Sequence, residues 1–169
     1  MAFPSLSIGD LTAKMPIVQG GMGVGISLSG LASAVANQGG IGVIAGAMIG
    51  MKEPDVAKNP IEANLRALRQ ELTKAREKTQ GIIGVNIMVA LTTFSQMVRT
   101  AIENRADIIF SGAGLPLEMP KHLLQACEEK KEEFKTKLVP IVSSARAATL
   151  IARKWLSRFD YLPDAFVVE

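Results

Sequence analysis

Small and polar residues recur in this sequence directly after short apolar runs, where they could hold a ligand. Glycine lets the backbone approach a flat ligand closely, and free amides near the start of a helix favour phosphate groups. For any single loop, the alternative is that glycine only permits a tight turn, but the repetition favours one shared binding site. The segments concerned are 19–23, 46–48, 86–88, 111–114 and 143–146, together with Glu169.

Asn86 is the most informative of these residues, because it is polar and its neighbours Val85 and Ile87 are apolar. Its carboxamide offers two donor hydrogens and an acceptor oxygen, which suits a ring with alternating polar edges such as a flavin. The alternative is that it satisfies the backbone of a neighbouring loop. The sequence shows no nucleophile–base pair and no cluster of metal ligands, so the catalytic group stays unknown and no metal site is expected.

Other features resemble functional motifs but have simpler explanations. The run Gly21–Gly25 superficially matches a dinucleotide-binding fingerprint. However, Ile26 stands where the third glycine is required, and no acidic residue ends the following apolar run. His122 and Cys127 lie in a charged amphipathic helical pattern, where a solvated histidine and a packed or inert thiol are expected.

Composition narrows the class of protein. The chain has 19 basic and 16 acidic residues, and no basic run interleaves with aromatic residues, so nucleic-acid binding is not expected. A single cysteine rules out a disulfide framework within the chain and favours a reducing, cytoplasmic compartment. No signal peptide is expected, because residues 1–10 lack a basic segment followed by an apolar core. No membrane association is expected either, because the long hydrophobic stretch 28–51 is broken by Asn37, Gln38 and glycines.

The elements that would position these residues alternate regularly along the chain. Helix 60–80 is the clearest, since Pro60 suits a first helical turn, Asn59 can cap its free amides and Gly81 ends it. A further helix begins after Thr92 or Thr93. The remaining helices are expected at 31–37, 120–132 and 145–155, and strands at 15–19, 41–44, 82–86, 107–111, 138–142 and 165–168.

This alternation predicts an α/β fold with a parallel sheet and right-handed crossovers. Two architectures fit: an open, doubly wound sheet and a TIM-type (β/α) barrel. A complete barrel has eight strands and about 250 residues, whereas the chain supplies about six strands and ends on an apolar run without a following helix. We therefore expect a single incomplete barrel domain over residues 1–169, truncated at its C-terminal end, with its strands in sequential order.

Five segments taken together carry a family likeness: 16–22, 84–88, 111–116, 140–148 and 164–169. They resemble, in order, strands of the nitronate monooxygenases (formerly 2-nitropropane dioxygenases) and of the related flavin-dependent enoyl-acyl-carrier-protein reductases. The resemblance implies a barrel that binds FMN and oxidises or reduces a small substrate. It also implies flavin contacts at Gly21, Met22, Gly23, Asn86, Ser111, Gly112, Ser143, Ser144 and Glu169.

In that family a glycine-rich segment with the catalytic histidine follows the sixth strand, and the main flavin-phosphate loops follow strands seven and eight. The sequence ends at Glu169, before these segments. FMN binding and activity by the 169 residues alone are therefore left open.

Three functions follow from the resemblance and the missing segments. The first is the N-terminal part of an FMN-dependent nitronate monooxygenase, which oxidises alkyl nitronates with molecular oxygen. The second is the same part of a flavin-dependent reductase acting on an enoyl thioester. The third is a non-catalytic barrel fragment that associates with itself or with a complementary chain. A non-redox lyase or isomerase would need a lysine or an acidic pair at the strand ends, where only Glu169 stands.

Overall fold

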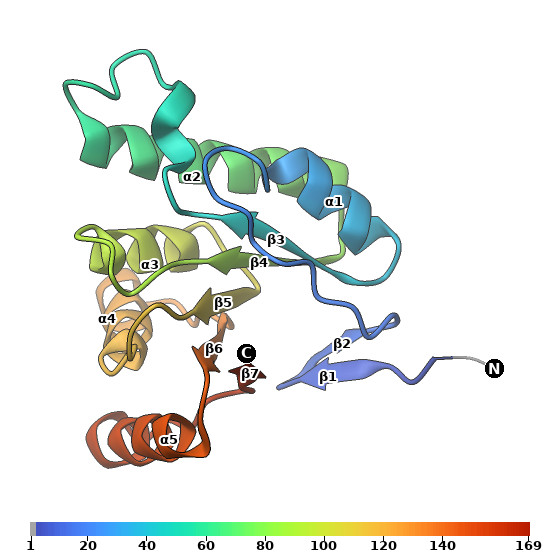
Figure 1. The fold of residues 1–169 in the computed structure, drawn as a ribbon, viewed down its shortest axis with the longest axis vertical. Coiled ribbons are helices and arrows are strands. Elements are labelled where there is room, and N and C mark those ends of the chain that lie inside the picture. The colour runs from blue at the N-terminus through green and yellow to red at the C-terminus, as the bar shows by residue number, and fades with distance from the viewer. Residues whose placement is uncertain (1–2) are drawn as a thin grey trace.

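A computed structural model describes residues 3–169 and shows a strongly curved parallel sheet with helices on its convex side (Figure 1). The strands are β3 (Ile41–Ala45), β4 (Ile82–Asn86), β5 (Ile108–Ser111), β6 (Lys137–Val142) and β7 (Val167–Val168), paired in that order. The helices are α1 (Ser29–Asn37), α2 (Pro60–Lys78), α3 (Phe94–Glu103), α4 (Met119–Lys130) and α5 (Ala145–Phe159). Sequential strand order confirms the incomplete barrel and contradicts a doubly wound sheet.

The first expected strand, 15–19, is only partly formed. It lies beside β3, where Val18 makes a single parallel bridge to Ile41. The side chain of Gln19 then replaces a peptide group: its Nε2 donates to the Val43 carbonyl at 3.0 Å, and its Oε1 accepts from the Val43 amide at 3.3 Å. The backbone leaves the ladder at this point, while the hydrogen bonding of β3 continues through the Gln19 carboxamide.

An antiparallel hairpin, which the sequence did not predict, precedes this segment. Strands β1 (Leu6–Ile8) and β2 (Leu11–Ala13) turn at Gly9, whose φ is +58°. The hairpin lies on the concave side of the sheet (Figure 1), where its buried Ile8 packs among inward-facing strand residues. Lys137 of β6 fixes it through an ion pair from Nζ to Asp10 Oδ1 at 2.6 Å.

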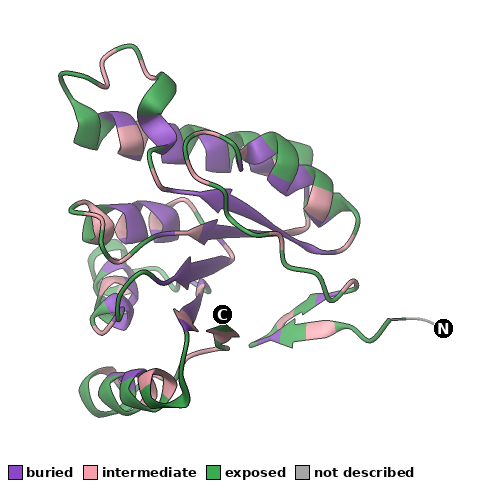
Figure 2. Ribbon diagram, in the orientation of Figure 1, coloured by how far each residue is buried: buried purple, intermediate pink, exposed green. Residues whose placement is uncertain are grey.

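Side chains on each strand alternate between two apolar clusters, as the two-residue repeat of a strand requires. On β5, for example, Ile109 packs toward the helices while Ile108 and Phe110 face the hairpin. Both faces of β3 to β6 are therefore largely buried (Figure 2), which explains their continuous apolar sequences. The alternation also decides which residues at the strand ends face the concave side.

The expected helix caps are not made by the predicted residues. Asn59 and Thr93 stand at the N-caps of α2 and α3, but neither side chain makes a capping hydrogen bond. Pro60 does occupy the first turn of α2, as expected. The chain before α2 is instead held by Arg66, which pairs with Glu53 at 2.8 Å and with Asp55.

Helix α1 receives its cap from another helix. Leu28 at its N-cap has no capping side chain, and the carboxylate of Glu71 on α2 accepts a hydrogen bond from the Ser29 amide at 2.9 Å. Lys74 donates to the other carboxylate oxygen at 2.8 Å. Burial raises the pKa of Glu71, but the hydrogen bonds from Lys74 and Ser29 outweigh it, so the pKa lies below its usual value.

We expect Glu71→Gln to lower the free energy of unfolding by about 1–2 kcal/mol near neutral pH, because the amide keeps the shape but loses the charge. A depressed pKa means that the ionised carboxylate stabilises the fold above the unfolded-state value of about 4.3. That contribution is lost as the pH falls through the folded-state pKa. Urea unfolding should therefore separate wild type and variant at about pH 7 and bring them together toward about pH 3. Glu77→Gln, at an exposed position of the same helix, should change little at either pH.

Candidate functional site

The carboxyl ends of the parallel strands meet at one end of the half-barrel, and the loops that leave them are bonded to one another. In Figure 1 the arrowheads of β3, β4 and β5 point toward this end. Backbone hydrogen bonds connect the first four loops in series: Val24 to Ala47 at 2.9 Å, Gly46 to Asn86 at 2.8 Å, and Val89 to Gly112 at 2.8 Å. Glu169 bonds to Val142 at 3.1 Å, and the ends of β5 and β6 border a common cavity with Glu169. The segments singled out in the sequence therefore lie along one rim.

Gly21 and Asn86 lie against each other in this rim. A β-carbon at position 21 would lie only 2.7 Å from the Asn86 Cβ and 3.6 Å from the Cβ of Ala45. Ala45 and Asn86 are partners in the β3–β4 register, so the first loop crosses directly over two strand ends. Only glycine at position 21 allows this approach, because it has no side chain. The side chain of Asn86 therefore lies directly against the backbone of Gly21.

Asn86 is half-buried, and its carboxamide makes no hydrogen bond to any of residues 3–169, so its polar atoms are open to solvent. Only its backbone carbonyl is engaged, by the amide of Gly46. The alternative role considered from the sequence, in which the side chain satisfies a neighbouring loop, is therefore not observed. A carboxamide with free donors and acceptor beside a glycine backbone fits the polar edge of a planar ring such as a flavin.

Ser27 shapes the first loop, although no pattern in the sequence indicates this role. Its fully buried hydroxyl accepts from the Met22 amide at 2.9 Å and from Gln19 Nε2 at 3.0 Å. The Ser27 carbonyl also accepts from the amide of Ala45 at 2.9 Å. The loop is thus fixed before any ligand arrives, and the amide of Met22 is already used within it.

Two more of the expected residues, Ser143 and Glu169, border a cavity of about 310 Å³ between the ends of β5 and β6 and the C-terminus. Ser144 stands next to it as the N-cap of α5, where its Oγ accepts from the Ala147 amide at 3.2 Å. The beginning of α1, in contrast, already holds the carboxylate of Glu71. A phosphate group would therefore meet repulsion at α1, whereas the cap of α5 is an uncharged hydroxyl.

Ser111 and Gly112, two further residues of the predicted flavin site, are both buried in this structure. Ser111 is fully buried and follows the inward-facing Phe110, so its hydroxyl turns to the helix side and donates to the Ile87 carbonyl at 2.8 Å. Gly112 is buried under Ile141, whose Cβ would lie 2.9 Å from a β-carbon at position 112. Both residues fix the strand ends around Asn86.

His122 and Cys127 lie on α4, in the outer helix layer, as expected from their sequence pattern. The ring of His122 packs edge-to-face on Phe94 with centroids 6.4 Å apart, so it is half-buried rather than freely solvated as predicted. Burial is the main cause that lowers its pKa. Cys127 accepts a weak hydrogen bond from the Phe134 amide at 3.5 Å. Within residues 3–169, no group of acidic, histidine or cysteine side chains could hold a metal ion.

A sequence model described as nitronate monooxygenase matches residues 5–169. The chain belongs to the nitronate monooxygenase family. No curated protein sequence matches the chain.

Two solved structures show how this nitronate monooxygenase family member relates to larger proteins. FabK from Thermotoga maritima is similar with a TM-score of 0.60 and 28% identity, over 82% of this chain and 37% of that one. A nitroalkane oxidase from Streptomyces ansochromogenes gives a TM-score of 0.63 over 91% of this chain and 46% of that one. At 18% identity the second likeness concerns the fold alone. The chain spans less than half the length of either protein.

Family membership, together with the parallel half-barrel, supports a flavin-type oxidoreductase. The rim fits such a cofactor at Gly21 and Asn86, where a glycine backbone leaves room and a carboxamide is free. Among residues 3–169, none of the helices has the length and apolar composition of a membrane-spanning segment.

Proposed function

We propose that the chain forms the N-terminal half of an FMN-dependent nitronate monooxygenase barrel, whose rim receives the flavin ring at Gly21 and Asn86. The observation that carries this proposal is the half-buried Asn86 carboxamide, which has no partner among residues 3–169 and lies against a glycine that no other residue could replace. When bound, the flavin supplies the redox chemistry, taking electrons from an alkyl nitronate and passing them to molecular oxygen.

The residues of this chain would bind and orient the cofactor. Asn86 would hydrogen-bond the polar edge of the ring, while Gly21, Met22 and Gly23 would lie along it through the backbone that Ser27 fixes. Ser143, Ser144 and Glu169 would contact the cofactor farther along the rim, around the cavity before α5. Because Ser111 and Gly112 are buried, their proposed role is to position the end of β4 rather than to present a side chain.

No residue of this chain is proposed as the catalytic base. The sequence contains one histidine, His122, and it lies on α4, packed against Phe94 of α3. The family resemblance puts the catalytic histidine after the sixth strand. The proposal therefore assigns cofactor binding, and no proton transfer, to residues 3–169.

A second candidate is reduction of an enoyl thioester on the same barrel, supported by the 28% identity with FabK. The two reactions differ in the second reactant, which returns the flavin to its starting oxidation state. Oxygen uptake that depends on an alkyl nitronate supports the first, and oxidation of a nicotinamide cofactor that depends on an enoyl thioester supports the second. A purified chain that is colourless and does not bind FMN would favour the non-catalytic fragment.

We expect Asn86→Leu to weaken FMN binding by about tenfold or more, because a leucine leaves polar atoms of the flavin unpaired at a cost of about 1–3 kcal/mol. The measurement is a titration of FMN into the apo form of the full-length enzyme, followed by quenching of flavin fluorescence. Asn104→Leu is the matched control, since Asn104 is also half-buried but donates to Thr100 at the far end of α3. The control should lower the melting temperature and leave the dissociation constant unchanged. Equal dissociation constants for wild type and Asn86→Leu would remove Asn86 from the flavin site.

A further inference from the structure

One buried hydroxyl group, that of Ser27, organises the start of the first loop (residues 20–26). Its oxygen accepts from the Met22 amide at 2.9 Å and from Gln19 Nε2 at 3.0 Å. Its hydrogen donates weakly to the Gly20 carbonyl at 3.5 Å. A hydroxyl has one donor hydrogen and two acceptor lone pairs, so these contacts use all of its hydrogen-bonding capacity. The first three residues of the loop are therefore folded around this one oxygen atom.

Gln19 links the Ser27 hydroxyl to the sheet. The Gln19 carboxamide bonds to the carbonyl and the amide of Val43, in the buried strand β3, at 3.0 and 3.3 Å. The Ser27 carbonyl accepts from the amide of Ala45, at the end of the same strand, at 2.9 Å. Ala45 is in turn the register partner of Asn86 on β4. These contacts hold the start of the loop at a fixed place relative to Asn86.

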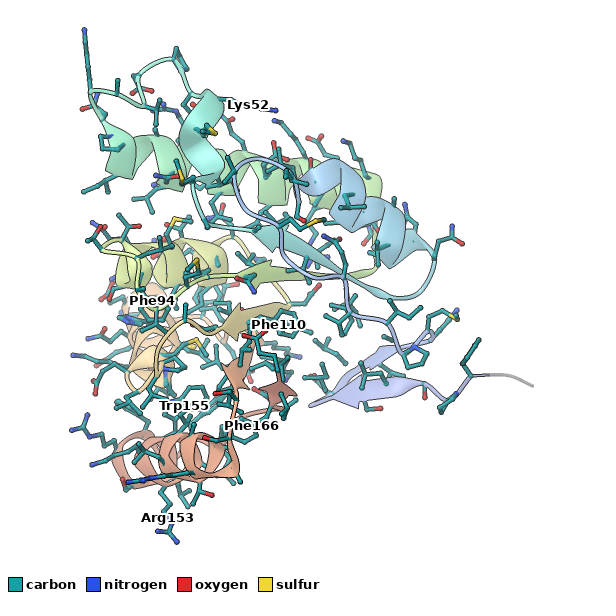
Figure 3. All side chains as sticks on the ribbon, viewed as in Figure 1. Lys52, Phe94, Phe110, Arg153, Trp155 and Phe166 are labelled. Carbon is teal, nitrogen blue, oxygen red and sulfur yellow. The ribbon has the colours of Figure 1, made fainter. Side chains whose placement is uncertain are left out.

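The second half of the loop is held by other groups. The Val24 amide donates to the Ala47 carbonyl at 2.9 Å. A β-carbon at Gly25 would lie 3.6 Å from the Cε of Lys52, which lies at the same end of the molecule (Figure 3). The Ser27 hydroxyl therefore acts on the first half of the loop, which is the half that crosses the strand ends.

These contacts divide the backbone amides of the loop into two kinds. The Met22 amide is used by Ser27 Oγ, whereas the amides of Gly21 and Gly23 donate to no acceptor among residues 3–169. Backbone amides without a partner in the protein are available to a ligand or to water. Gly21 also lies against Asn86, since a β-carbon at position 21 would come within 2.7 Å of the Asn86 Cβ. Free backbone donors and a free carboxamide thus share one part of the rim.

We propose that Ser27, held by Gln19, is a positioning residue of the flavin site. By engaging the Met22 amide, it keeps the amides of Gly21 and Gly23 free and in place, as donors to acceptor atoms on the edge of the ring. Donors that are ordered before binding raise the affinity, because the cost of ordering them falls on folding. Ser27 is fully buried, so it acts through the backbone without touching the cofactor. The inference rests on the proposed function and adds backbone donors to the Asn86 carboxamide.

The first test measures hydrogen exchange in the apo form of the full-length enzyme, by mass spectrometry with fragmentation to single residues. After correction for intrinsic rates, the Met22 amide should exchange about tenfold or more slowly than those of Gly21 and Gly23, because its hydrogen bond must open first. Ser27→Ala should remove this difference. Ser33→Ala is the matched control: Ser33 is also buried, but its hydroxyl donates to the Ser29 carbonyl within α1, so the exchange of Met22 should not change.

The second test measures FMN binding to the same variants below their melting temperatures. Ser27→Ala should weaken binding by about tenfold, because a Met22 amide without its acceptor no longer fixes the turn. Ser33→Ala should lower the melting temperature and leave the dissociation constant unchanged. Gln19→Met keeps the side-chain length but loses the carboxamide bonds, so it should weaken binding too. The double variant should lose little more than either single variant, because both residues act through one contact.

The outcomes separate the inference from the proposed function. A full-length wild type that does not bind FMN would overturn the proposed function and this inference with it. If the wild type binds FMN and Ser27→Ala binds it equally well, the inference alone fails. It also fails if the Met22 amide of the wild type exchanges as fast as those of Gly21 and Gly23. Additive losses in the double variant would contradict it as well, because Gln19 would then act independently of Ser27.

Discussion

Replacing Gly42 by alanine is expected to prevent folding, or to lower the free energy of unfolding by about 3 kcal/mol or more. Gly42 lies in β3, directly under α1, and a β-carbon there would lie 1.9 Å from the Ala32 carbonyl oxygen and 2.5 Å from its carbonyl carbon. These are backbone atoms of a helix, so no side-chain rotation relieves the clash. Helix α1 would have to separate from the sheet, which would open the buried contact at Ala32.

Gly30→Ala is the matched control, and it should raise the free energy of unfolding instead of lowering it. Gly30 lies in α1, has no heavy atom within 4 Å of the position a β-carbon would take, and does not need a left-handed backbone. Alanine at an exposed helical position stabilises by about 0.5–1 kcal/mol relative to glycine. Thermal and urea unfolding followed by circular dichroism would measure both variants. Wild-type stability in Gly42→Ala would mean that α1 does not pack on β3 as described.

The 169-residue chain by itself is expected to self-associate at about 10–100 µM. Within the described residues, β7 pairs only with β6 and the segment 15–19 only with β3, so both edges of the half-barrel present unpaired backbone groups. Apolar side chains accompany them, with Val168 77% and Ile17 55% exposed. Edges of this kind pair readily with other chains.

Charged substitutions at the two edges should reduce this association. We expect Val168→Lys combined with Ile17→Lys to shift the chain toward monomer without lowering its melting temperature, because both side chains are exposed. Leu124→Lys on the outer surface of α4 should leave association unchanged. Size-exclusion chromatography with light scattering gives the masses. A monodisperse wild-type monomer across this concentration range would contradict the expectation.

Much of the fold follows from local sequence, because periodicity and turn residues act within a few positions. The alternation of apolar runs with helical patterns correctly predicted β3 to β7 and all five helices, with boundaries shifted by one to a few residues. Barrel order followed from the rule that consecutive parallel strands tend to be neighbours. The same local patterns carried the family resemblance, which the match over residues 5–169 confirms.

Contacts between distant segments were decided only by the tertiary structure. Glu71 caps α1 from 42 residues away, while the locally plausible caps at Asn59 and Thr93 are not made. The hairpin of β1 and β2 is too short to show a pattern, and it is held by Lys137 from β6. A capping rule that considers only neighbouring residues cannot predict a carboxylate supplied by another helix.

In the candidate site too, the sequence predicted some features and only the tertiary structure decided the others. The sequence by itself determined which residues end the strands, and hence that Gly21, Asn86 and Glu169 lie on one rim. It could not determine where each side chain points, because a shift of one residue along a strand moves a side chain to the opposite face. Ser111 thus turns away to Ile87. Asn86 is left with a free carboxamide against Gly21, since only the packed fold brings the first loop within contact of the end of β4.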